Sequence, residues 1–267
     1  HLGAHKSLIP ESRGFDEFYG FIIGGHRYFP DDLTLNDLTE ARRQMDGYIT
    51  KIYDNGKRIN TSKYLTEELS DNAVKFVDDN SENPFFLYLS YNAPHTPLQA
   101  TEKDLVRNMH IEEENRRTYA AMVTSMDDGI GLILDKLEEK KISDNTIVIF
   151  FSDNGGVEWY NYSDNGELRG IKGDFFEGGI RVPFVMQWPD LLPAGLTYDN
   201  PIIALDIFAT AASVANAEQY IKSDIDGVNL IPYILGQKDD LPHDYLYWQN
   251  RDKDIDVIRG ERYKYLR

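Results

Sequence analysis

The chain has 267 residues, of which 45 are acidic and 28 are basic, so its formal net charge is -17 at pH 7. A surface this negative repels the phosphate backbone, which argues against a nucleic-acid-binding protein, and an anionic ligand would need a local cluster of cations. The sequence contains no cysteine, so it has no disulfide, no thiolate metal ligand and no cysteine nucleophile. The length suits one large α/β domain, or such a domain with a small appendage, and no apolar run is long enough to insert into a membrane.

The first 30 residues are rich in glycine and aromatic residues, which predicts a loop that crosses the surface. His26 and Arg27 place two potential cations directly after Gly24 and Gly25, where the backbone is flexible. This pair is either part of a solvated loop or a contact for an anionic ligand, and the sequence favours neither. After a polar stretch without catalytic patterns, Thr66 is expected to cap a helix.

Residues 84–91 are almost continuously apolar and predict a core strand that is buried on both faces. The strand is followed by Asn92-Ala93-Pro94-His95-Thr96-Pro97, in which two prolines stiffen the loop around the histidine. In open α/β sheets, ligands bind beyond the carboxyl ends of the strands. Although a lone histidine is more often structural, we therefore interpret His95 as a functional residue.

Apolar residues at three- and four-residue spacing predict a helix over residues 112–140, which leads into a second buried strand at 147–152. That strand ends in Asp153, Asn154, Gly155 and Gly156. An acid and an amide at the end of a core strand would place oxygen ligands at the edge of the sheet. The same residues are ordinary turn formers, so a turn and a site are equally compatible with this stretch alone.

The segment before the third core strand, 184–188, combines cations with glycines. Arg169, Lys172 and Arg181 stand among several glycines that permit close backbone approach. An anion site is the functional interpretation, and a surface loop with scattered charges is the alternative.

The remaining elements complete the predicted fold. A helix is expected over 202–214, and short strands at 245–248, 256–259 and 263–266 predict a small antiparallel sheet. The expected fold is α/β, with a mostly parallel sheet flanked by helices. We assign residues 1–215 to its catalytic domain and residues 216–267 to a small C-terminal α+β subdomain.

Taken in order, several stretches resemble motifs of the sulfatases that use a formylglycine nucleophile, within the alkaline-phosphatase superfamily. They are His1-Leu2-Gly3, Gly14 to Gly20, Pro94-His95-Thr96-Pro97, Ser152-Asp153-Asn154-Gly155, and Gly170-Ile171-Lys172-Gly173 with Glu177-Gly178-Gly179. The resemblance covers nearly the whole chain. It implies an alkaline-phosphatase-like fold, hydrolysis of sulfate esters and a periplasmic or secreted location.

The resemblance also implies a role for individual residues. Asp153 and Asn154 would be ligands of a Ca²⁺ ion that holds the sulfate, and His1 would contact the hydroxyls of the formylglycine hydrate. His95 and Lys172 would bind sulfate oxygens and help the alcohol to leave. These roles agree with the preference of calcium for oxygen ligands and with the stabilisation of a transferring sulfuryl group by fixed cations.

The start of the chain resembles the branch of the family that acts on sulfated sugars. We therefore expect a sulfated carbohydrate or an aryl sulfate as substrate, with His26, Arg27 and Arg169 as substrate-binding residues. A formylglycine-generating enzyme is the partner that the family implies during maturation.

The sequence departs from the family at the nucleophile. It contains no Cys/Ser-x-Pro-x-Arg motif, and the segment from Ser7 to Arg13 has the wrong spacing. We therefore expect the C-terminal part of a sulfatase, with an incomplete calcium site and little hydrolytic activity by itself. Two alternatives remain: a non-catalytic protein that binds sulfated glycans, and a metal-dependent phosphodiesterase of the same superfamily.

Overall fold

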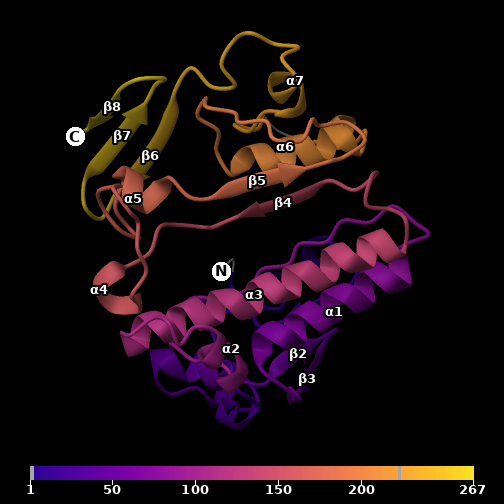
Figure 1. Ribbon diagram of the computed structural model, residues 1–267, viewed down its shortest axis with the longest axis vertical. Helices are drawn as coiled ribbons and strands as arrows, with labels where there is room; N and C mark the ends of the chain where they lie inside the picture. The colour runs from indigo at the N-terminus through magenta and orange to yellow at the C-terminus, as the bar shows by residue number, and fades with distance from the viewer. Residues whose placement is uncertain (1–2, 222–223) are drawn as a thin grey trace.

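The computed structural model describes residues 3–221 and 224–267 (Figure 1). The N-terminal part consists of loops, short 3₁₀ helices and a small sheet. In this sheet β1 (Tyr19–Gly20) pairs with β2 (Ile52–Asp54), and β2 pairs with β3 (Lys57–Ile59), both in antiparallel register. The 3₁₀ helices are η1 (Pro10–Arg13), η2 (Pro30–Asp32), η3 (Leu38–Glu40) and η4 (Gln44–Ile49).

Two long helices, α1 (Leu65–Asn80) and α3 (Glu114–Glu139), lie side by side, and the short α2 (Glu102–Arg107) packs against α3 (Figure 1). The helix predicted over 112–140 is confirmed, and the carboxylate of Glu113 caps it by accepting hydrogen bonds from two backbone N–H groups of the first turn. The predicted cap of α1 is wrong. Tyr64 precedes the helix, while Thr66 is fully buried within its first turn.

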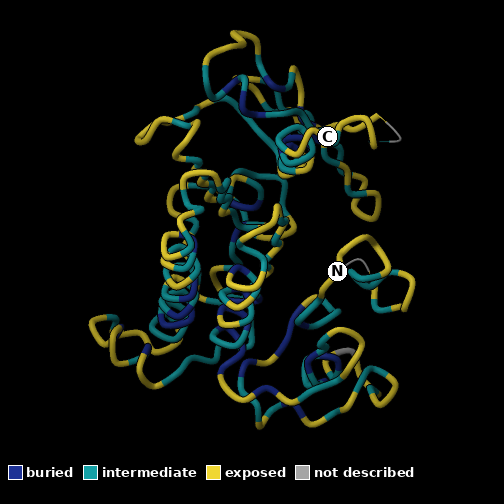
Figure 2. Tube along the Cα trace, turned by 90° about the vertical axis from the view of Figure 1, so that its right-hand side faces the viewer, coloured by how far each residue is buried: buried dark blue, intermediate teal, exposed yellow. Residues whose placement is uncertain are grey.

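A buried hydrophobic cluster joins the N-terminal loops to these helices. Figure 2 shows buried residues along the helices and in the N-terminal part of the chain. The cluster consists of Tyr28, Leu33, Ile52, Tyr64, Leu65, Leu69, Ala93 and Met122. The loop before His95 is therefore attached to the core through Ala93. None of the helices in the described ranges combines the length and the apolar character needed to cross a membrane.

Strands β4 (Val148–Phe151) and β5 (Phe184–Gln187) form the sheet next to the candidate site, and in the view of Figure 1 they run between α3 and α6 (Leu205–Val214). They pair antiparallel, with Phe151 opposite Phe184. This pair therefore departs from the mostly parallel sheet that the sequence predicts. A parallel pair needs a crossover to the other end of the sheet, whereas here Ser152 donates a backbone hydrogen bond to Pro183 at 3.2 Å, so the connection returns at the same end.

The segment 84–91, for which the sequence predicts a strand, has no regular secondary structure and pairs with no strand among the described residues. Phe85 packs edge-on against Phe76 of α1, with 5.7 Å between the ring centroids. Phe86 and Tyr88 point the other way and are 60% and 62% exposed. The expectation that both faces of this segment are buried is therefore wrong, because only the face toward α1 is covered.

The C-terminal part contains an antiparallel sheet of β6 (Leu246–Asn250), β7 (Ile255–Arg259) and β8 (Lys264–Leu266), as expected. Two short helices, η5 (Glu218–Tyr220) and α7 (Ile231–Ile234), precede it. Buried Asp206 of α6 holds this part of the chain by accepting hydrogen bonds from the Val228 N–H at 2.9 Å and from His243 Nε2 at 2.8 Å. The α/β class and the C-terminal antiparallel sheet are thus confirmed.

Candidate functional site

The turn after β4 presents oxygen atoms to solvent. Asp153 is exposed, and its carboxylate has no hydrogen bond or ion pair with the described residues. The turn is stabilised from within: Ser152 Oγ donates to the Asn154 carbonyl at 3.0 Å, and Asn154 Nδ2 donates to the Gly155 carbonyl at 3.0 Å. Asn154 Oδ1 accepts no hydrogen bond from the described residues, so it remains an available acceptor in the residue that follows Asp153.

Two glycine pairs explain how this turn is placed. Gly155 donates its N–H to the Gly179 carbonyl at 3.0 Å, and a Cβ at position 155 would lie 1.7 Å from the carbonyl oxygen of Gly178. A Cβ at Gly178 would in turn lie 2.2 Å from the carbonyl oxygen of Gly170. Short helix α5 (Glu177–Ile180) therefore contacts both the turn and the loop at 168–174 at distances that exclude a side chain.

The loop containing Lys172 is held beside this turn. Gly170 and Gly173 have φ values of +95° and +89°, which glycine adopts without strain. Asp174 Oδ2 accepts a hydrogen bond from the Ile171 N–H at 3.1 Å, and Lys172 donates its N–H to the Gly156 carbonyl at 3.4 Å. The exposed ammonium group of Lys172 has no ion-pair partner in the ranges that the structure describes. It is therefore available for an external anion.

Asn165 connects the turn and the loop, and sequence analysis did not single it out. Its Oδ1 accepts the Gly156 N–H at 3.0 Å, while its Nδ2 donates to the carbonyls of Gly156 and Gly170 at 3.0 and 3.1 Å. The local sequence Asp164-Asn165-Gly166 indicates only a turn, because the bonded glycines are not its sequence neighbours.

His95 belongs to a separate set of hydrogen-bonded residues. Its Nδ1 lies 2.7 Å from the Thr96 carbonyl oxygen, and since a carbonyl only accepts, Nδ1 must carry the proton. The Nε2 atom remains for a ligand. Buried Tyr28 stabilises this loop, because its Oη donates to the carbonyls of Asn92 and His95 at 2.9 and 2.7 Å. No hydrogen bond between described residues connects His95 directly to the Lys172 loop.

His26 is a structural residue in this arrangement, which corrects its expected role in substrate binding. It is 0% exposed, and its ring nitrogens lie 2.9 and 2.8 Å from the carbonyl oxygens of Arg27 and Thr50. Burial lowers the pKa of His26, although these two carbonyls act in the opposite direction. With no exposed ring atom, His26 cannot contact a ligand in this conformation.

The other two predicted substrate-binding residues remain accessible. The charge of Arg27 is partly balanced within the protein, because its guanidinium forms an ion pair with Asp32 at 3.3 Å. Arg169 is exposed, and its guanidinium lies over the Phe176 ring, 4.0 Å from the ring centroid. Arg169 and Phe176 border a cavity of about 320 Å³ that Lys264 and Glu177 also line. His1 lies outside the described residues.

The chemistry of Asp153 and Asn154 fits part of a calcium site. Their side chains offer a carboxylate and an amide oxygen, whereas Ca²⁺ takes about six to eight oxygen ligands. In the described parts of the chain, no group of three or more His, Asp or Glu residues is placed to hold a metal ion. Further oxygens must therefore come from groups other than these residues.

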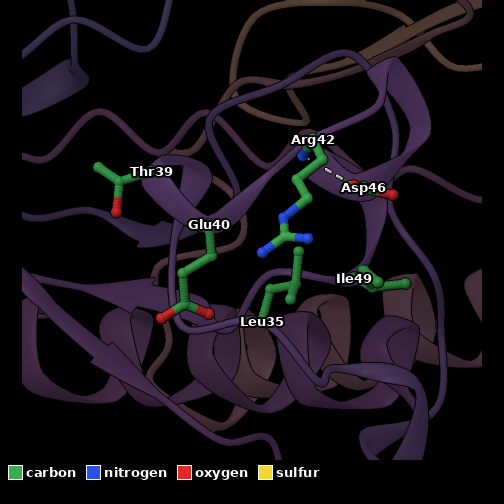
Figure 3. Close-up of a pocket in the computed structure, with 6 residues that line it drawn as sticks. All are labelled: Leu35, Thr39, Glu40, Arg42, Asp46 and Ile49. Carbon is green, nitrogen blue, oxygen red and sulfur yellow. Dashed lines mark hydrogen bonds between the residues drawn. The ribbon is translucent and has the colours of Figure 1, made fainter.

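A larger cavity, of about 530 Å³, lies elsewhere, among the loops of the N-terminal part (Figure 3). Figure 3 shows the Arg42 guanidinium pointing into it, with Glu40 and Asp46 also lining it. Asp46 accepts the Arg42 N–H at 2.8 Å. Since two carboxylates accompany one cation, this cavity does not favour an anionic ligand.

Comparisons with known proteins identify the family. The Sulfatase family profile matches residues 3–217. An uncharacterized sulfatase of Escherichia coli K12, YdeN, is 32% identical over 242 residues, which are 90% of this chain and 40% of that protein. Human steryl-sulfatase is 34% identical over 190 residues, or 68% of this chain and 32% of that protein.

Solved structures give the same result. The structure of Ps i-CgsB in complex with k-i-k-neocarrahexaose aligns with a TM-score of 0.89 and 38% identity, over 100% of this chain and 60% of that one. The PsFucS1 sulfatase from Pseudoalteromonas sp. has the same fold, with a TM-score of 0.80 and 23% identity, over 99% of this chain and 56% of that one. The chain thus spans between about a third and three fifths of the length of these four relatives. It belongs to the sulfatase family.

Proposed function

We propose that the chain carries part of the active site of a sulfatase that hydrolyses sulfate esters of a sulfated sugar. The observation that supports this most directly is the joining of the Asp153–Gly156 turn to the Lys172 loop. The Lys172 N–H donates to the Gly156 carbonyl at 3.4 Å, and Asn165 bonds to both segments. The backbone of the Lys172 loop is therefore held beside the turn that carries Asp153 and Asn154. A lysine and oxygen ligands on neighbouring segments supply the charges that a metal-assisted sulfate site needs.

The residues of the chain have distinct roles in this proposal. Asp153 and Asn154 hold a Ca²⁺ ion together with oxygens from outside this group, and the ion supplies positive charge to the sulfate oxygens when it is bound. Lys172 binds a sulfate oxygen through its ammonium group. His95 keeps its Nδ1 proton on the Thr96 carbonyl and, in the imidazolium form, donates the Nε2 proton to the leaving alcohol oxygen. From the family resemblance alone, we assign His1 a contact with the nucleophile.

The nucleophile itself is proposed to be a formylglycine hydrate outside this sequence, made by a formylglycine-generating enzyme. The sequence has no cysteine and no Cys/Ser-x-Pro-x-Arg motif that such an enzyme would modify. We propose the periplasm or the extracellular space as the location, from the family resemblance alone.

A sulfated oligosaccharide is the proposed substrate class. The high similarity to Ps i-CgsB, which was solved with k-i-k-neocarrahexaose, supports an oligosaccharide ligand. Arg169 supports an anionic one, because its guanidinium is exposed beside the Lys172 loop and is oriented by the Phe176 ring at 4.0 Å.

Sulfate release tests this proposal. The longest natural form of the protein, co-expressed with a formylglycine-generating enzyme, is assayed with Ca²⁺ on an aryl sulfate and on sulfated galacto-oligosaccharides. We expect Asp153→Ala and Lys172→Met each to reduce kcat/KM by about 100-fold or more, the usual effect of removing one group that stabilises transition-state charge. Lys57→Met, at an exposed position of β3, is the matched control and should have full activity.

Three results would contradict the proposal. The first is turnover that does not change in the Lys172→Met variant. The second is hydrolysis of phosphodiesters in preference to sulfate esters, which would favour the phosphodiesterase alternative. The third is binding of sulfated oligosaccharides without any release of sulfate, which would indicate a non-catalytic glycan-binding protein.

A further inference from the structure

One lysine of the C-terminal sheet reaches the segments that carry the candidate site. Lys264 of β8 has only 13% of its side chain exposed and forms an ion pair with Glu177, the first residue of α5. Its Nζ also donates to the Phe175 carbonyl at 2.9 Å. Arg259 of β7 adds a second cation, with Nε 3.9 Å from the same Glu177 carboxylate. Two strands of the C-terminal sheet thus converge on one carboxylate.

The Glu177 carboxylate is held in its charged form. Partial burial by itself raises the pKa of Glu177, but the hydrogen bond from Lys264 and the charges of Lys264, Arg259 and Arg181 outweigh burial, so the pKa is lowered. A lysine that makes both an ion pair and a hydrogen bond to the main chain fixes its partners more firmly than an exposed pair does.

The residues directly after Glu177 support both functional segments. Gly178 donates its N–H to the Arg169 carbonyl at 2.7 Å, and Gly179 accepts the Gly155 N–H at 3.0 Å. A shift of Gly178 and Gly179 would therefore move the loop of Arg169 and Lys172 and the turn of Asp153 and Asn154 together. Both contacts are close, since a Cβ at position 155 would lie 1.7 Å from the Gly178 carbonyl oxygen and a Cβ at position 178 would lie 2.2 Å from the Gly170 carbonyl oxygen.

We propose that Lys264 is a positioning residue for the candidate sulfate site. By binding the Glu177 carboxylate and the Phe175 carbonyl, it fixes α5, and α5 sets the spacing between the metal-binding turn and the Lys172 loop. The C-terminal sheet is then part of the support of the site, and not an independent appendage. The term sulfate site rests on the proposed function, whereas the mechanical coupling rests on the contacts alone.

Hydrogen–deuterium exchange of the full chain tests the coupling. We compare Lys264→Met and Lys264→Arg with the parent protein, using Arg262→Met as the matched control, because Arg262 is 80% exposed and pairs only weakly with neighbouring Glu261. In Lys264→Met, exchange in peptides covering 153–157 and 168–179 should be about tenfold faster, the factor expected for the loss of one charge-assisted hydrogen bond. Peptides from α3 should not change. Lys264→Arg, which retains the charge and several donors, should restore most of the protection.

The proposal is wrong if Lys264→Met leaves exchange at 153–157 unchanged, or if α3 loses protection to the same extent, because the effect would then be global. If Lys264→Met does not fold, Glu177→Gln decides the question: it retains the shape of the side chain but loses the charge, and it should show the same local pattern with a smaller amplitude.

Activity separates this proposal from the proposed function. In a protein that releases sulfate, Lys264→Met should lower kcat/KM at least tenfold and Lys264→Arg should largely restore it. If no sulfate ester is cleaved but the local exchange pattern is found, the sulfatase function fails and the positioning role stands. If the parent is active and Lys264→Met has normal exchange and normal kinetics, the positioning role fails alone.

Discussion

Replacing Gly155 with alanine is the sharpest single test of how the site is assembled. The added Cβ would lie 1.7 Å from the Gly178 carbonyl oxygen and 2.8 Å from its carbon, so the turn must move by about 1.7 Å to reach an ordinary contact distance of 3.4 Å. That movement breaks the 3.0 Å hydrogen bond from the Gly155 N–H to the Gly179 carbonyl. Loss of a hydrogen bond costs about 1 kcal/mol and overpacking against rigid backbone costs about 1–3 kcal/mol, so we expect a loss of about 2–4 kcal/mol.

Urea denaturation followed by circular dichroism measures this loss as a change in the free energy of unfolding. Gly131→Ala is the matched control, because Gly131 lies within α3 and a Cβ there meets no atom within 4 Å. The control should be stabilised by about 0.5–1 kcal/mol, since alanine favours the helix. If Gly155→Ala were as stable as the parent, with unchanged exchange in residues 153–157, the close approach of Gly155 to α5 would be refuted.

Three further predictions concern other parts of the structure. Asp206→Ala leaves two backbone N–H groups and a histidine ring without their acceptor, so the free energy of unfolding in urea should fall by about 3 kcal/mol, whereas exposed Asp239→Ala should change it little. Because the pKa of buried His26 is lowered from the ordinary 6.5, its contribution to stability is complete above pH 6.5 and is lost as the pH falls toward the lowered pKa of the folded state. The difference between unfolding free energies at pH 7.5 and pH 5.5 should therefore shrink in His26→Asn, and an unchanged difference would contradict the assignment. Asn165→Ala should lower kcat/KM and increase exchange around Gly156, while Asn165→Asp, which retains only the acceptor, should be intermediate; equal behaviour of both variants and the parent would exclude the bridging role.

Patterns that depend on neighbours along the chain were predicted correctly. The three- and four-residue spacing of apolar side chains located α3, and short apolar runs between turns located the strands of the C-terminal sheet. The end of β4 was predicted for the same reason, because an apolar run stops abruptly at Asp153. These signals are local, because each helix or strand is indicated by the residues within it and directly beside it.

Patterns that depend on partners distant in sequence were not predictable in this way. The segment 84–91 has the composition of a core strand, but strand formation also requires a neighbouring strand to pair with. None of the described strands pairs with this segment. The residues between β4 and β5 connect the end of β4 to the adjacent start of β5, so the two strands are antiparallel. The order of helices and strands along the sequence does not reveal this direction. Pairing direction is therefore a property of the assembled sheet.

The candidate site residues show the same limit. His26 and His95 both stand in glycine- or proline-rich loops, yet His26 is fully enclosed with both ring nitrogens against carbonyl oxygens, whereas Nε2 of His95 has no hydrogen-bond partner among the described residues. Burial decides between a structural and a functional histidine, and the local sequence does not encode it. Asn165 and Lys264 were missed because their partners lie 5 to 89 residues away along the chain.

The central claim is that Asp153, Asn154 and Lys172 surround one sulfate group. The most direct measurement is a crystal structure of the protein with Ca²⁺ and a sulfated galacto-oligosaccharide. Our account predicts the sulfate within hydrogen-bonding distance of the Lys172 ammonium group, with the metal ion bound by Asp153 and Asn154. An oligosaccharide bound in the cavity that contains Arg42, with Lys172 and Asp153 free of ligand, would contradict it.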